Sequence, residues 1–308
     1  MKHSISRLQT PNLFVPGAPK SGTTYLANIL CTHPEVFIPG EKELHFFCDW
    51  KYAEDKRPNY ESRFHDRDCD QKLKWWADCS TSYWTQESAA SLIQKHYPNS
   101  RILILLRDPI SQIYSHYWHL RRQNFHCENT EKLNLQEAIQ QYPEHLLEPA
   151  LYSKHLSTWK NYFGSNVKVI LFEDLIKGQE KLDQISEFLG LSSTLKSPES
   201  LDSRGGVEPK NKLLESVYRS AYRNTTRALI KPVDAIFGWD NFLKYFNRIG
   251  ARQKLELLFY RKKSSRISDE DASFIVELLR ADLNNLPEQL GFQPDCWRSY
   301  RMAQNDTS

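Results

Sequence analysis

Residues 14–30, FVPGAPKSGTTYLANIL, constrain the fold of this chain more than any other stretch of its sequence. An apolar strand end leads into a turn that contains Gly17 and Gly22, and a helical pattern follows over residues 23–30. Backbone N–H groups at the start of such a helix have no partner inside it, and the helix dipole favours negative charge there. The stretch therefore predicts an α/β fold with an anion-binding site in its first strand-to-helix turn.

The lysine of this turn is displaced from the position that a nucleoside-triphosphate loop requires. The pattern of that loop is G-x-x-x-x-G-K-[ST], and Gly17 and Gly22 have its spacing. Thr24 stands at the Ser/Thr position, but Thr23 occupies the lysine position. Lys20 lies within the loop instead, where its ammonium would approach a shorter anion than a triphosphate. A tight turn with an exposed lysine is the alternative, but the string PKSGTT between a strand and a helix favours the anion site.

Apolar runs that alternate with helical patterns extend the α/β pattern along the chain. The expected strands cover residues 12–16, 101–107 and 167–175, the last two being continuous apolar runs typical of strands buried on both faces of a parallel sheet. The expected helices cover residues 23–30, 180–191 and 268–291, and a further helix begins at Pro109. We therefore predict a central parallel sheet flanked by helices, with a helical C-terminal portion.

The length and composition of the chain favour one domain. The chain has 308 residues, of which 40% are hydrophobic and 26% are charged, so it can bury a sizeable core. No repeat or low-complexity linker divides it, and we predict a single domain over residues 1–308. Residues 47–76 are interpreted as polar, aromatic and irregular. Residues 204–262, which are basic and aromatic with a helical pattern, could form a helical subdomain or lid.

The charge and the terminal sequence limit the partners and the location that we expect. A net charge of +3 is too small to indicate nucleic-acid binding, but it suits a local basic pocket for a small polyanion. The N-terminus has no apolar signal region, and the longest aliphatic run, residues 102–106, is far too short to span a membrane. We expect a soluble, cytoplasmic protein with no nucleic-acid partner and no membrane span. The six cysteines show no C-x-x-C pair or metal spacing, so we expect reduced thiols and no metal.

A second candidate site follows the apolar run of residues 101–107. Arg107 ends that run, at the edge where open α/β sheets bind ligands, and Ser115 lies eight residues later in the next predicted helix. An arginine fork and a hydroxyl suit a second phosphate group. Two alternatives stay open. Arg107 could pair with a carboxylate while Ser115 is an ordinary helix residue, or Asp108 could be the magnesium-binding aspartate of a Walker B strand.

Together, the two motifs resemble those of the sulfotransferases that use PAPS (3′-phosphoadenosine 5′-phosphosulfate). In that family a P-K-x-G-T-[TS] loop binds the 5′-phosphosulfate, and an R-[DN]-P element with a later serine binds the 3′-phosphate. The resemblance implies a P-loop-containing nucleotide-binding fold, PAPS as the co-substrate, PAP (adenosine 3′,5′-bisphosphate) as the product, and no metal. It implies donor contacts from the following residues: Lys20, Ser21, Gly22, Thr23, Thr24, Arg107, Ser115 and Lys210.

The resemblance extends, with less specific motifs, over about residues 12–298. EKELHFF (41–47) looks like the segment that carries the catalytic glutamate in heparan-type and many bacterial small-molecule sulfotransferases. DCSTSYW (78–84) looks like their [ED]-x-[ST]-P-x-Y-[FL] element. The chain departs from the family at Cys79, where the glycan-modifying members have a lysine, and at Thr81, where a proline is usual. These departures concern the acceptor more than the donor.

The resemblance implies catalytic roles for Lys20, Glu43 and His45. Lys20 would stabilise the negative charge that develops on the bridging oxygen of the donor. Glu43 is the first choice of base for the acceptor, with His45 as runner-up or helper, and on a strand two such residues would face the same side. The alternatives are a solvated lysine, a surface glutamate and a core histidine. Tyr83 and Trp84 are candidates for contacts with adenine.

The predicted function is transfer of a sulfuryl group from PAPS to a hydroxyl or amine of a small-molecule acceptor, such as a natural product. The protein could be a homodimer. The alternatives are sulfation of a glycan or lipid, a magnesium-ATP-dependent P-loop kinase, and a non-catalytic module that binds adenosine phosphates. Thr23 at the lysine position argues against the kinase. The presence of both Lys20 and Glu43 argues against the non-catalytic module.

Overall fold

The computed structural model describes residues 9–40, 42–65, 72–123, 133–197, 207–209, 260–262 and 267–305. By its internal contacts the chain separates into two compact units, residues 1–201 with 267–308 and residues 202–266. The first unit carries both sequence motifs. Of the second unit the structure describes two strands that pair antiparallel, β6 (Val207–Pro209) and β7 (Tyr260–Lys262).

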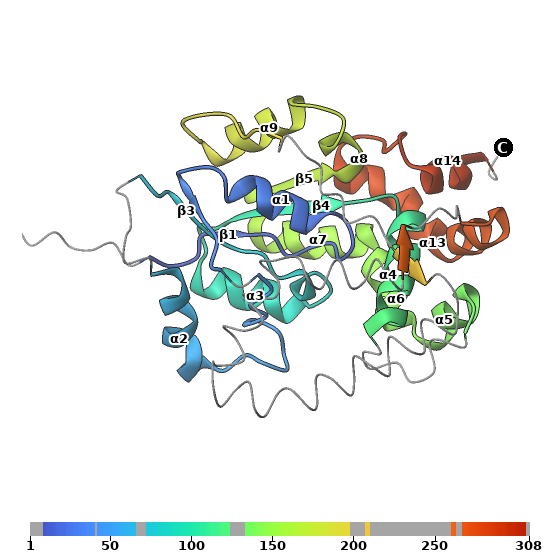
Figure 1. Ribbon diagram of the computed structural model, residues 1–308, viewed down its shortest axis with the longest axis horizontal. Coiled ribbons are helices and arrows are strands. Elements are labelled where there is room, and N and C mark those ends of the chain that lie inside the picture. The colour runs from blue at the N-terminus through green and yellow to red at the C-terminus, as the bar shows by residue number, and fades with distance from the viewer. Residues whose placement is uncertain are drawn as a thin grey trace, which may run out of the picture. The chain divides into compact units, whose positions relative to one another are not determined.

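A five-stranded, all-parallel sheet lies at the centre of the first unit (Figure 1). The strand order is β2-β3-β1-β4-β5. The strands are β1 (Leu13–Phe14), β2 (Val36–Phe37), β3 (Trp75–Asp78), β4 (Arg101–Leu106) and β5 (Val167–Leu171). The carboxyl ends of parallel strands lie at one edge of a sheet. Because β1 is flanked by β3 and β4, the segments that follow these three strands meet at that edge.

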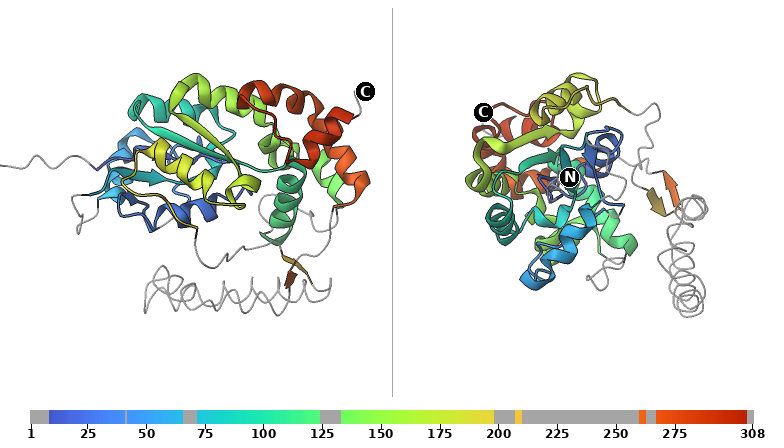
Figure 2. Two further views of the ribbon diagram at one scale, coloured as in Figure 1. Left: turned by 90° about the horizontal axis from the view of Figure 1, so that it is seen from above. Right: turned by 90° about the vertical axis from the view of Figure 1, so that its left-hand side faces the viewer.

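Helices cover both faces of this sheet (Figure 2), and a hydrophobic cluster lies on each face. The even-numbered residues of β4 from 102 onward pack with the helices α3 (Glu87–His96) and α7 (Tyr152–Phe163). The odd-numbered leucines of β4 pack with α1 (Thr23–Leu30) and α9 (Glu180–Leu189). Burial on both faces explains why the sequence of β4 is continuously apolar rather than alternating.

A third hydrophobic cluster lies between helices rather than on the sheet. It joins α4 (Pro109–Gln123), α5 (Leu135–Gln141), α13 (Asp269–Leu290) and α14 (Arg298–Asn305). The helix predicted over residues 268–291 begins with Ser268 as its N-cap, a residue type typical of that position, and the hydroxyl of Ser268 accepts the N–H of Asp271 at 3.0 Å. α13 and α14 form the predicted helical C-terminal portion.

The connecting segments contain short helices. The short α-helices are α2 (Arg57–Glu61), α6 (Pro143–Leu146) and α8 (Phe172–Leu175). The 3₁₀ helices are η1 (Glu54–Lys56), η2 (Ser62–Phe64), η3 (Thr81–Tyr83), η4 (Glu148–Ala150) and η5 (Gly164–Asn166).

The predicted fold class is confirmed, while several predicted elements are corrected. The strand predicted over residues 167–175 ends at Leu171, where α8 begins, and it is only partly buried because β5 lies at the edge of the sheet. The strand predicted over residues 12–16 is confined to β1. Residues 47–76, interpreted as irregular, contain three short helices and the start of β3. Several of their aromatic side chains, among them Phe47, Tyr60 and Phe64, pack into the core, which hydropathy alone does not reveal. Trp50 is the exception and is exposed.

Three predictions about the whole chain are not tested. Most of residues 204–262 lies outside the described residues, so the single domain and the helical subdomain or lid stay predictions. In the part of the chain that the structure describes, no helix is both long enough and apolar enough to cross a membrane. The cytoplasmic location stays a prediction.

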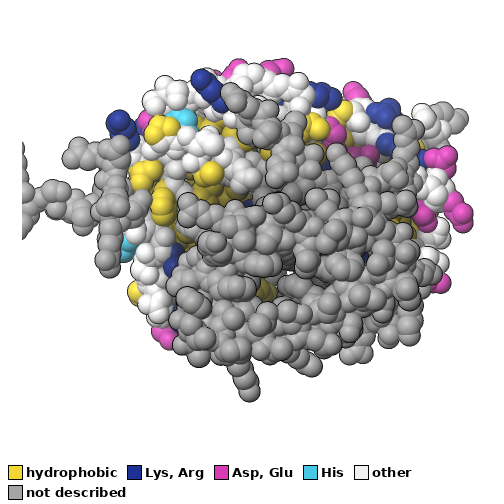
Figure 3. Space-filling model, in the orientation of Figure 1, with side chains coloured by type: hydrophobic (Ala, Val, Ile, Leu, Met, Phe, Trp, Pro, Cys, Tyr) yellow, Lys and Arg dark blue, Asp and Glu magenta, His cyan; other side chains and the backbone are white. Residues whose placement is uncertain are grey.

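On the face shown in Figure 3, the Lys and Arg side chains of described residues lie among Asp and Glu side chains.

Candidate active site

The turn after β1 packs against two aromatic side chains at its glycines. A Cβ on Gly17 would lie 2.6 Å from Cβ of Trp84, and a Cβ on Gly22 would lie 2.3 Å from Cδ2 of Phe172. Gly22 also has a φ of 92°, in the left-handed region that other residues seldom adopt. Both glycines of the G-x-x-x-x-G spacing are therefore required by the surrounding structure.

The N-terminus of α1 is open to an anion. Gly22 is its N-cap, no side chain caps it, and its first turn contains no acidic residue. Thr24 is exposed at this end, while Thr23 is nearly buried. The N–H groups and the helix dipole can therefore bind a negatively charged group here. Ser21 is fully buried, and its N–H donates to the carbonyl of Ala18 at 3.3 Å, so its side chain faces the interior of the turn.

Arg107 lies beside this turn, because β4 is a sheet neighbour of β1. Its Nη1 donates to the carbonyl oxygen of Lys20 at 3.4 Å, and its guanidinium carbon lies 5.3 Å from the centre of the Phe172 ring. Gln112 in α4 donates from Nε2 to the carbonyl of Pro19 at 3.0 Å. The two sequence motifs therefore contact each other directly.

The face of α4 that carries Gln112 also carries Ser115 and His116, one turn further along the helix. Ser115 is partly exposed, and the structure places it on the side of α4 that reaches the turn. Burial lowers the pKa of His116 to about 3, and neighbouring positive charges, including that of Lys20, act in the same direction. His116 is therefore neutral at neutral pH and lies near Lys20.

Asp108 holds the starts of two helices. Its Oδ1 accepts the N–H of Ile110 and its Oδ2 accepts the N–H of Arg298, both at 3.3 Å. Its own N–H donates to Oε1 of Glu173 at 3.0 Å, and the residue is buried. Because both carboxylate oxygens already accept backbone N–H groups of α4 and α14, the surroundings do not favour the Walker B interpretation.

Glu43 is held by neighbours on two sides. Its Oε2 accepts the N–H of Thr81 at 2.7 Å, and the Thr81 hydroxyl lies 3.1 and 3.2 Å from the two carboxylate oxygens. On the other side, Nζ of Lys42 lies 2.6 Å from Oε1 of Glu43 and 3.4 Å from Oγ1 of Thr23. Because Thr23 is the first residue of α1, Lys42 connects the Glu43 carboxylate to the anion-binding end of that helix.

His45 lies next to Glu43 and is fixed by two serines. Its Nδ1 is 2.6 Å from Oγ of Ser82 and 3.9 Å from Oε2 of Glu43. Its N–H donates to Oγ of Ser80 at 3.0 Å. The side chains of Glu43 and His45 are 28% and 31% exposed, so both can reach a molecule that binds at the surface.

The expectation that Glu43 and His45 lie on a strand is wrong. Both are in a loop, with φ angles of 67° and 56°, so left-handed turns rather than strand alternation bring them together. Among the described residues other than glycine, only these two and Lys20, with a φ of 62°, have positive φ angles. Each such conformation costs about 1–3 kcal/mol and tends to occur at functional sites. The three strained residues are those for which the resemblance implies catalytic roles.

A buried carboxylate at the end of β3 anchors the segment that holds Glu43 and His45. Asp78 accepts hydroxyl hydrogens from Ser80 at 2.5 Å, Tyr60 at 2.8 Å and Tyr83 at 2.9 Å. Burial raises the pKa of Asp78 to about 6, and the three hydroxyls partly offset that effect. Asp78 therefore fixes Ser80, which in turn fixes the backbone of His45.

These contacts unite an anion-binding turn, an arginine and a held carboxylate. Residues 10–204 match the family model described as a sulfotransferase domain. The chain belongs to the sulfotransferase family. The match covers the turn, Arg107 and the whole segment from Glu43 to Trp84, so the residues that form the site are those that the family model spans.

Relatives of this sulfotransferase include proteins named for heparan sulfate. The chain is 25% identical over 200 residues to the bifunctional heparan sulfate N-deacetylase/N-sulfotransferase 1 of Mus musculus, across 60% of the chain and 22% of that protein. It is 25% identical over 203 residues to the human heparan sulfate glucosamine 3-O-sulfotransferase 3B1, across 59% of the chain and 47% of that protein. The chain therefore matches less than half the length of either relative.

A solved structure shares the fold of the sulfotransferase. The crystal structure of a sulfotransferase from Alicyclobacillus acidocaldarius superposes with a TM-score of 0.63 at 20% sequence identity, over 96% of this chain and 100% of that chain. The agreement supports the parallel sheet and its flanking helices.

Two predicted adenine contacts are corrected by the structure. Trp84 is buried, with its indole N–H donating to the carbonyl of Pro149 at 2.9 Å, and Tyr83 is buried with its hydroxyl on Asp78. Both belong to the core, because the segment after β3 turns inward. Cys79 is also buried, which raises the pKa of its thiol to about 12. Lys210 lies outside the described residues, so its predicted contact stays a prediction.

Three residues of the site are absent from the sequence-based prediction of its contacts. Phe172 separates Gly22 from Arg107, Lys42 connects Thr23 to Glu43, and Thr81 binds Glu43. Lys42 could have been found from its place directly before the candidate base. Thr81 lies 38 residues from Glu43, and Phe172 lies 150 residues from Gly22 and 65 residues from Arg107, so no local pattern marks them.

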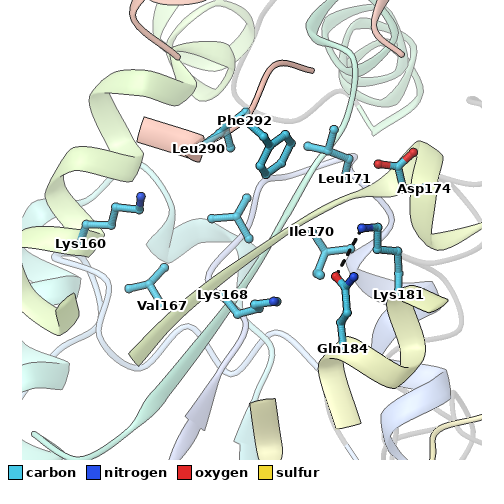
Figure 4. Close-up of a pocket in the computed structure, with 11 residues that line it drawn as sticks. Lys160, Val167, Lys168, Ile170, Leu171, Asp174, Lys181, Gln184, Leu290 and Phe292 are labelled. Atoms are coloured by element: carbon cyan, nitrogen blue, oxygen red, sulfur yellow. Dashed lines mark hydrogen bonds between the residues drawn. The ribbon is translucent and has the colours of Figure 1, made fainter. Parts of the chain in front are cut away.

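A groove along the outer edge of β5 is separate from this site (Figure 4). It has a volume of about 390 Å³. Its walls come from β5, from Lys160 of α7, Asp174 of α8 and Lys181 of α9, and from Leu290 and Phe292 at and just beyond the end of α13. None of the predicted site residues lines it.

Proposed function

We propose that this sulfotransferase transfers a sulfuryl group from PAPS to a hydroxyl or amine of a small-molecule acceptor, such as a natural product. One observation carries the proposal. The anion-binding turn is connected to Arg107 through the carbonyl of Lys20, and to Glu43 through the Lys42 contact with Thr23. A site for two anionic groups and a base for the acceptor therefore belong to one set of contacts.

The residues around the turn suit the two anionic ends of the donor. The open N-terminus of α1, the exposed Thr24 and the ammonium of Lys20 would hold the 5′-phosphosulfate. Arg107, oriented by the ring of Phe172, and the partly exposed Ser115 would hold the 3′-phosphate. The donor contact that the family resemblance implies for Lys210 stays part of the proposal, although this residue lies outside the described ones.

Glu43 would act as the base. The bound donor supplies a sulfuryl group, whose sulfur forms a bond to the acceptor oxygen or nitrogen while its bond to the bridging oxygen breaks. Glu43 takes the proton of the acceptor, and Lys20 stabilises the negative charge that remains on the departing PAP. His45, held by Ser82, assists from 3.9 Å away.

Lys42 would provide the positive charge that the family resemblance leads one to expect from a lysine at position 79. Position 79 carries a buried cysteine, but the Lys42 ammonium reaches both Thr23 and Glu43. It can therefore stabilise negative charge between the donor and the base.

A glycan acceptor is the second candidate, because the relatives named above bear the name of heparan sulfate. The replacement of a family lysine by Cys79 favours the small molecule. The kinase interpretation receives no support, because Thr23 occupies the lysine position and both oxygens of Asp108 bind backbone N–H groups.

A transfer assay tests the proposal. The purified chain is incubated with PAPS, without added metal, and with separate pools of phenols, aliphatic alcohols, amines and heparan oligosaccharides, and the release of PAP is measured. Parallel samples contain ATP and magnesium in place of PAPS, and the consumption of ATP is measured. We expect release with at least one small-molecule pool, and release that is slower by roughly a hundredfold or more from the Glu43→Gln variant. Release only with heparan oligosaccharides would favour the glycan, and consumption of ATP with magnesium but no release of PAP would refute the proposal.

A further inference from the structure

The side chain of Trp50 is strongly exposed beside the candidate base. It is 68% exposed, more than any other large hydrophobic side chain in the described ranges. Its ring centre lies 5.6 Å from that of His45, with 47° between the two ring planes. When a ligand covers a large apolar ring that is otherwise exposed to water, the burial of the ring stabilises the complex.

Hydrogen bonds hold the backbone on both sides of Trp50, so the point from which the indole projects is set. The amides of Lys51 and Tyr52 both donate to the carbonyl of Cys48 at 2.8 Å. The N–H of Asp49 donates to Oε1 of Gln86 at 3.0 Å. Phe46 and Phe47, which precede this turn in the sequence, are buried in the core. A ligand that covers the indole therefore does not have to order this backbone segment, which lowers the free-energy cost of binding.

Only one of the three aromatic side chains Phe46, Phe47 and Trp50 points away from the core. Phe46 stacks on Tyr60 with ring centres 4.4 Å apart, and Phe47 packs edge-on against Phe14 at 6.2 Å, so both support the sheet. Trp50 contacts His45 instead, whose Nδ1 is 3.9 Å from Glu43. The exposed ring is thus two contacts away from the candidate base and belongs to the rim of the candidate site.

We infer that Trp50 is the acceptor-binding platform of this enzyme and that the acceptor carries a ring with a flat apolar face. The ring would lie on the indole and direct a hydroxyl or amine on its rim toward Glu43. An aromatic ring and the C–H face of a pyranose share this chemistry, whereas a flexible alkyl chain lacks it. The inference rests on the proposed function, because it gives Glu43 the role of base.

Saturation-transfer NMR tests the platform without requiring turnover. The probes are phenol, methyl β-D-glucopyranoside and 1-hexanol, each measured with and without PAP. The proteins are the wild type, Trp50→Ala and Phe292→Ala, the last being a control at an exposed aromatic on the groove along β5. We expect transfer to the ring protons of phenol or of the glucoside, lost in Trp50→Ala and kept in Phe292→Ala. A saturation-transfer signal from phenol alone would indicate an aromatic acceptor, and a signal from the glucoside alone would indicate a sugar. Equal signals in Trp50→Ala and wild type, or a signal from hexanol only, would overturn the inference.

Kinetics provide the second readout once an acceptor is found. Trp50→Ala should raise KM for a ring acceptor roughly three- to tenfold, the loss expected for one aromatic contact, and leave KM for PAPS unchanged. Trp50→Phe should restore most of the difference because it keeps an aromatic face. An unchanged KM for the acceptor in Trp50→Ala would refute the platform even if PAPS is used. If PAP does not bind the wild type, the proposed function fails, and the ring probes still decide the role of Trp50.

Discussion

The backbone N–H of Thr81 donates to Oε2 of Glu43 at 2.7 Å, and the hydroxyl of Thr81 lies 3.1 and 3.2 Å from the two carboxylate oxygens. The resemblance to known sulfotransferases leads one to expect a proline at this position, and proline has no N–H to donate. The departure from the family pattern at Thr81 therefore supplies two donors that orient the candidate base.

Replacing Thr81 should separate these two donors. Thr81→Pro removes both and should lower kcat by roughly tenfold to a hundredfold, as expected for hydrogen bonds to a charged group. Thr81→Ala keeps the N–H and should have a smaller effect, and Thr81→Ser keeps both donors and serves as the control. Steady-state kinetics and PAP affinity are measured for each variant. A proline variant with wild-type kcat would show that Glu43 is not positioned in this way.

Glu43→Gln tests the base directly. The amide keeps the shape of the side chain and cannot take a proton, so kcat should fall by about 10²- to 10⁴-fold while the affinity for PAP stays within twofold or so of wild type. The matched variant His45→Gln should have a weaker effect, because His45 is the helper. If Glu43→Gln retains full kcat and His45→Gln loses it, the base is His45.

Gly22→Ala should disrupt donor binding for two reasons. Its new Cβ would lie 2.3 Å from the Phe172 ring, and alanine is strained at a φ of 92°. We expect a much weaker affinity for PAP and a lower melting temperature. Gly178→Ala is the control, because a Cβ there meets nothing within 4 Å. Adding Phe172→Ala to Gly22→Ala removes the clash but not the strain, so rescue should be partial. Normal PAP affinity in Gly22→Ala would mean that the turn is not the donor site.

The buried Asp78 predicts a specific dependence of stability on pH. Its pKa of about 6 in the folded protein exceeds the ordinary value of 3.8, so between these values the folded state binds more protons than the unfolded state. The free energy of unfolding contributed by Asp78 should therefore fall as the pH rises through this window, by roughly 3 kcal/mol in total.

Urea unfolding at several pH values across this window measures the effect. Asp78→Asn carries no titrating group, so the difference in free energy of unfolding between wild type and variant should change in that direction and by about that amount. Asp49→Asn, an exposed aspartate in the neighbouring segment, is the control. A difference that does not change with pH, or that grows with the opposite sign, would contradict the environment described for Asp78.

Local sequence patterns predict the elements that carry their own signals. α1 and the N-cap of α13 are found where the glycine turn and Ser268 place them. The apolar run of β4 is a strand because both of its faces are covered. β3 escaped prediction because it is short and begins with Trp75 and Trp76 in a region rich in polar residues.

The parts of the site that sequence reasoning missed depend on tertiary contacts. The strand alternation expected for Glu43 and His45 fails because backbone contacts with the segment after β3 hold both residues in left-handed conformations. The N–H of Glu43 donates to the carbonyl oxygen of Cys79 at 3.2 Å, and the N–H of His45 donates to the hydroxyl oxygen of Ser80 at 3.0 Å. Trp84 looked available for adenine, yet its neighbour Gly17 allows it to pack inside. Such outcomes depend on which distant segments meet, which periodicity does not encode.

Calorimetric titration with PAP, and separately with ATP and magnesium, tests the central claim most directly. The account predicts binding of PAP without metal, and a loss of affinity in Arg107→Ala that is much smaller for adenosine 5′-phosphosulfate, which lacks the 3′-phosphate. Binding of magnesium-ATP without binding of PAP would contradict the account. So would PAP affinity that is the same in Arg107→Ala and wild type.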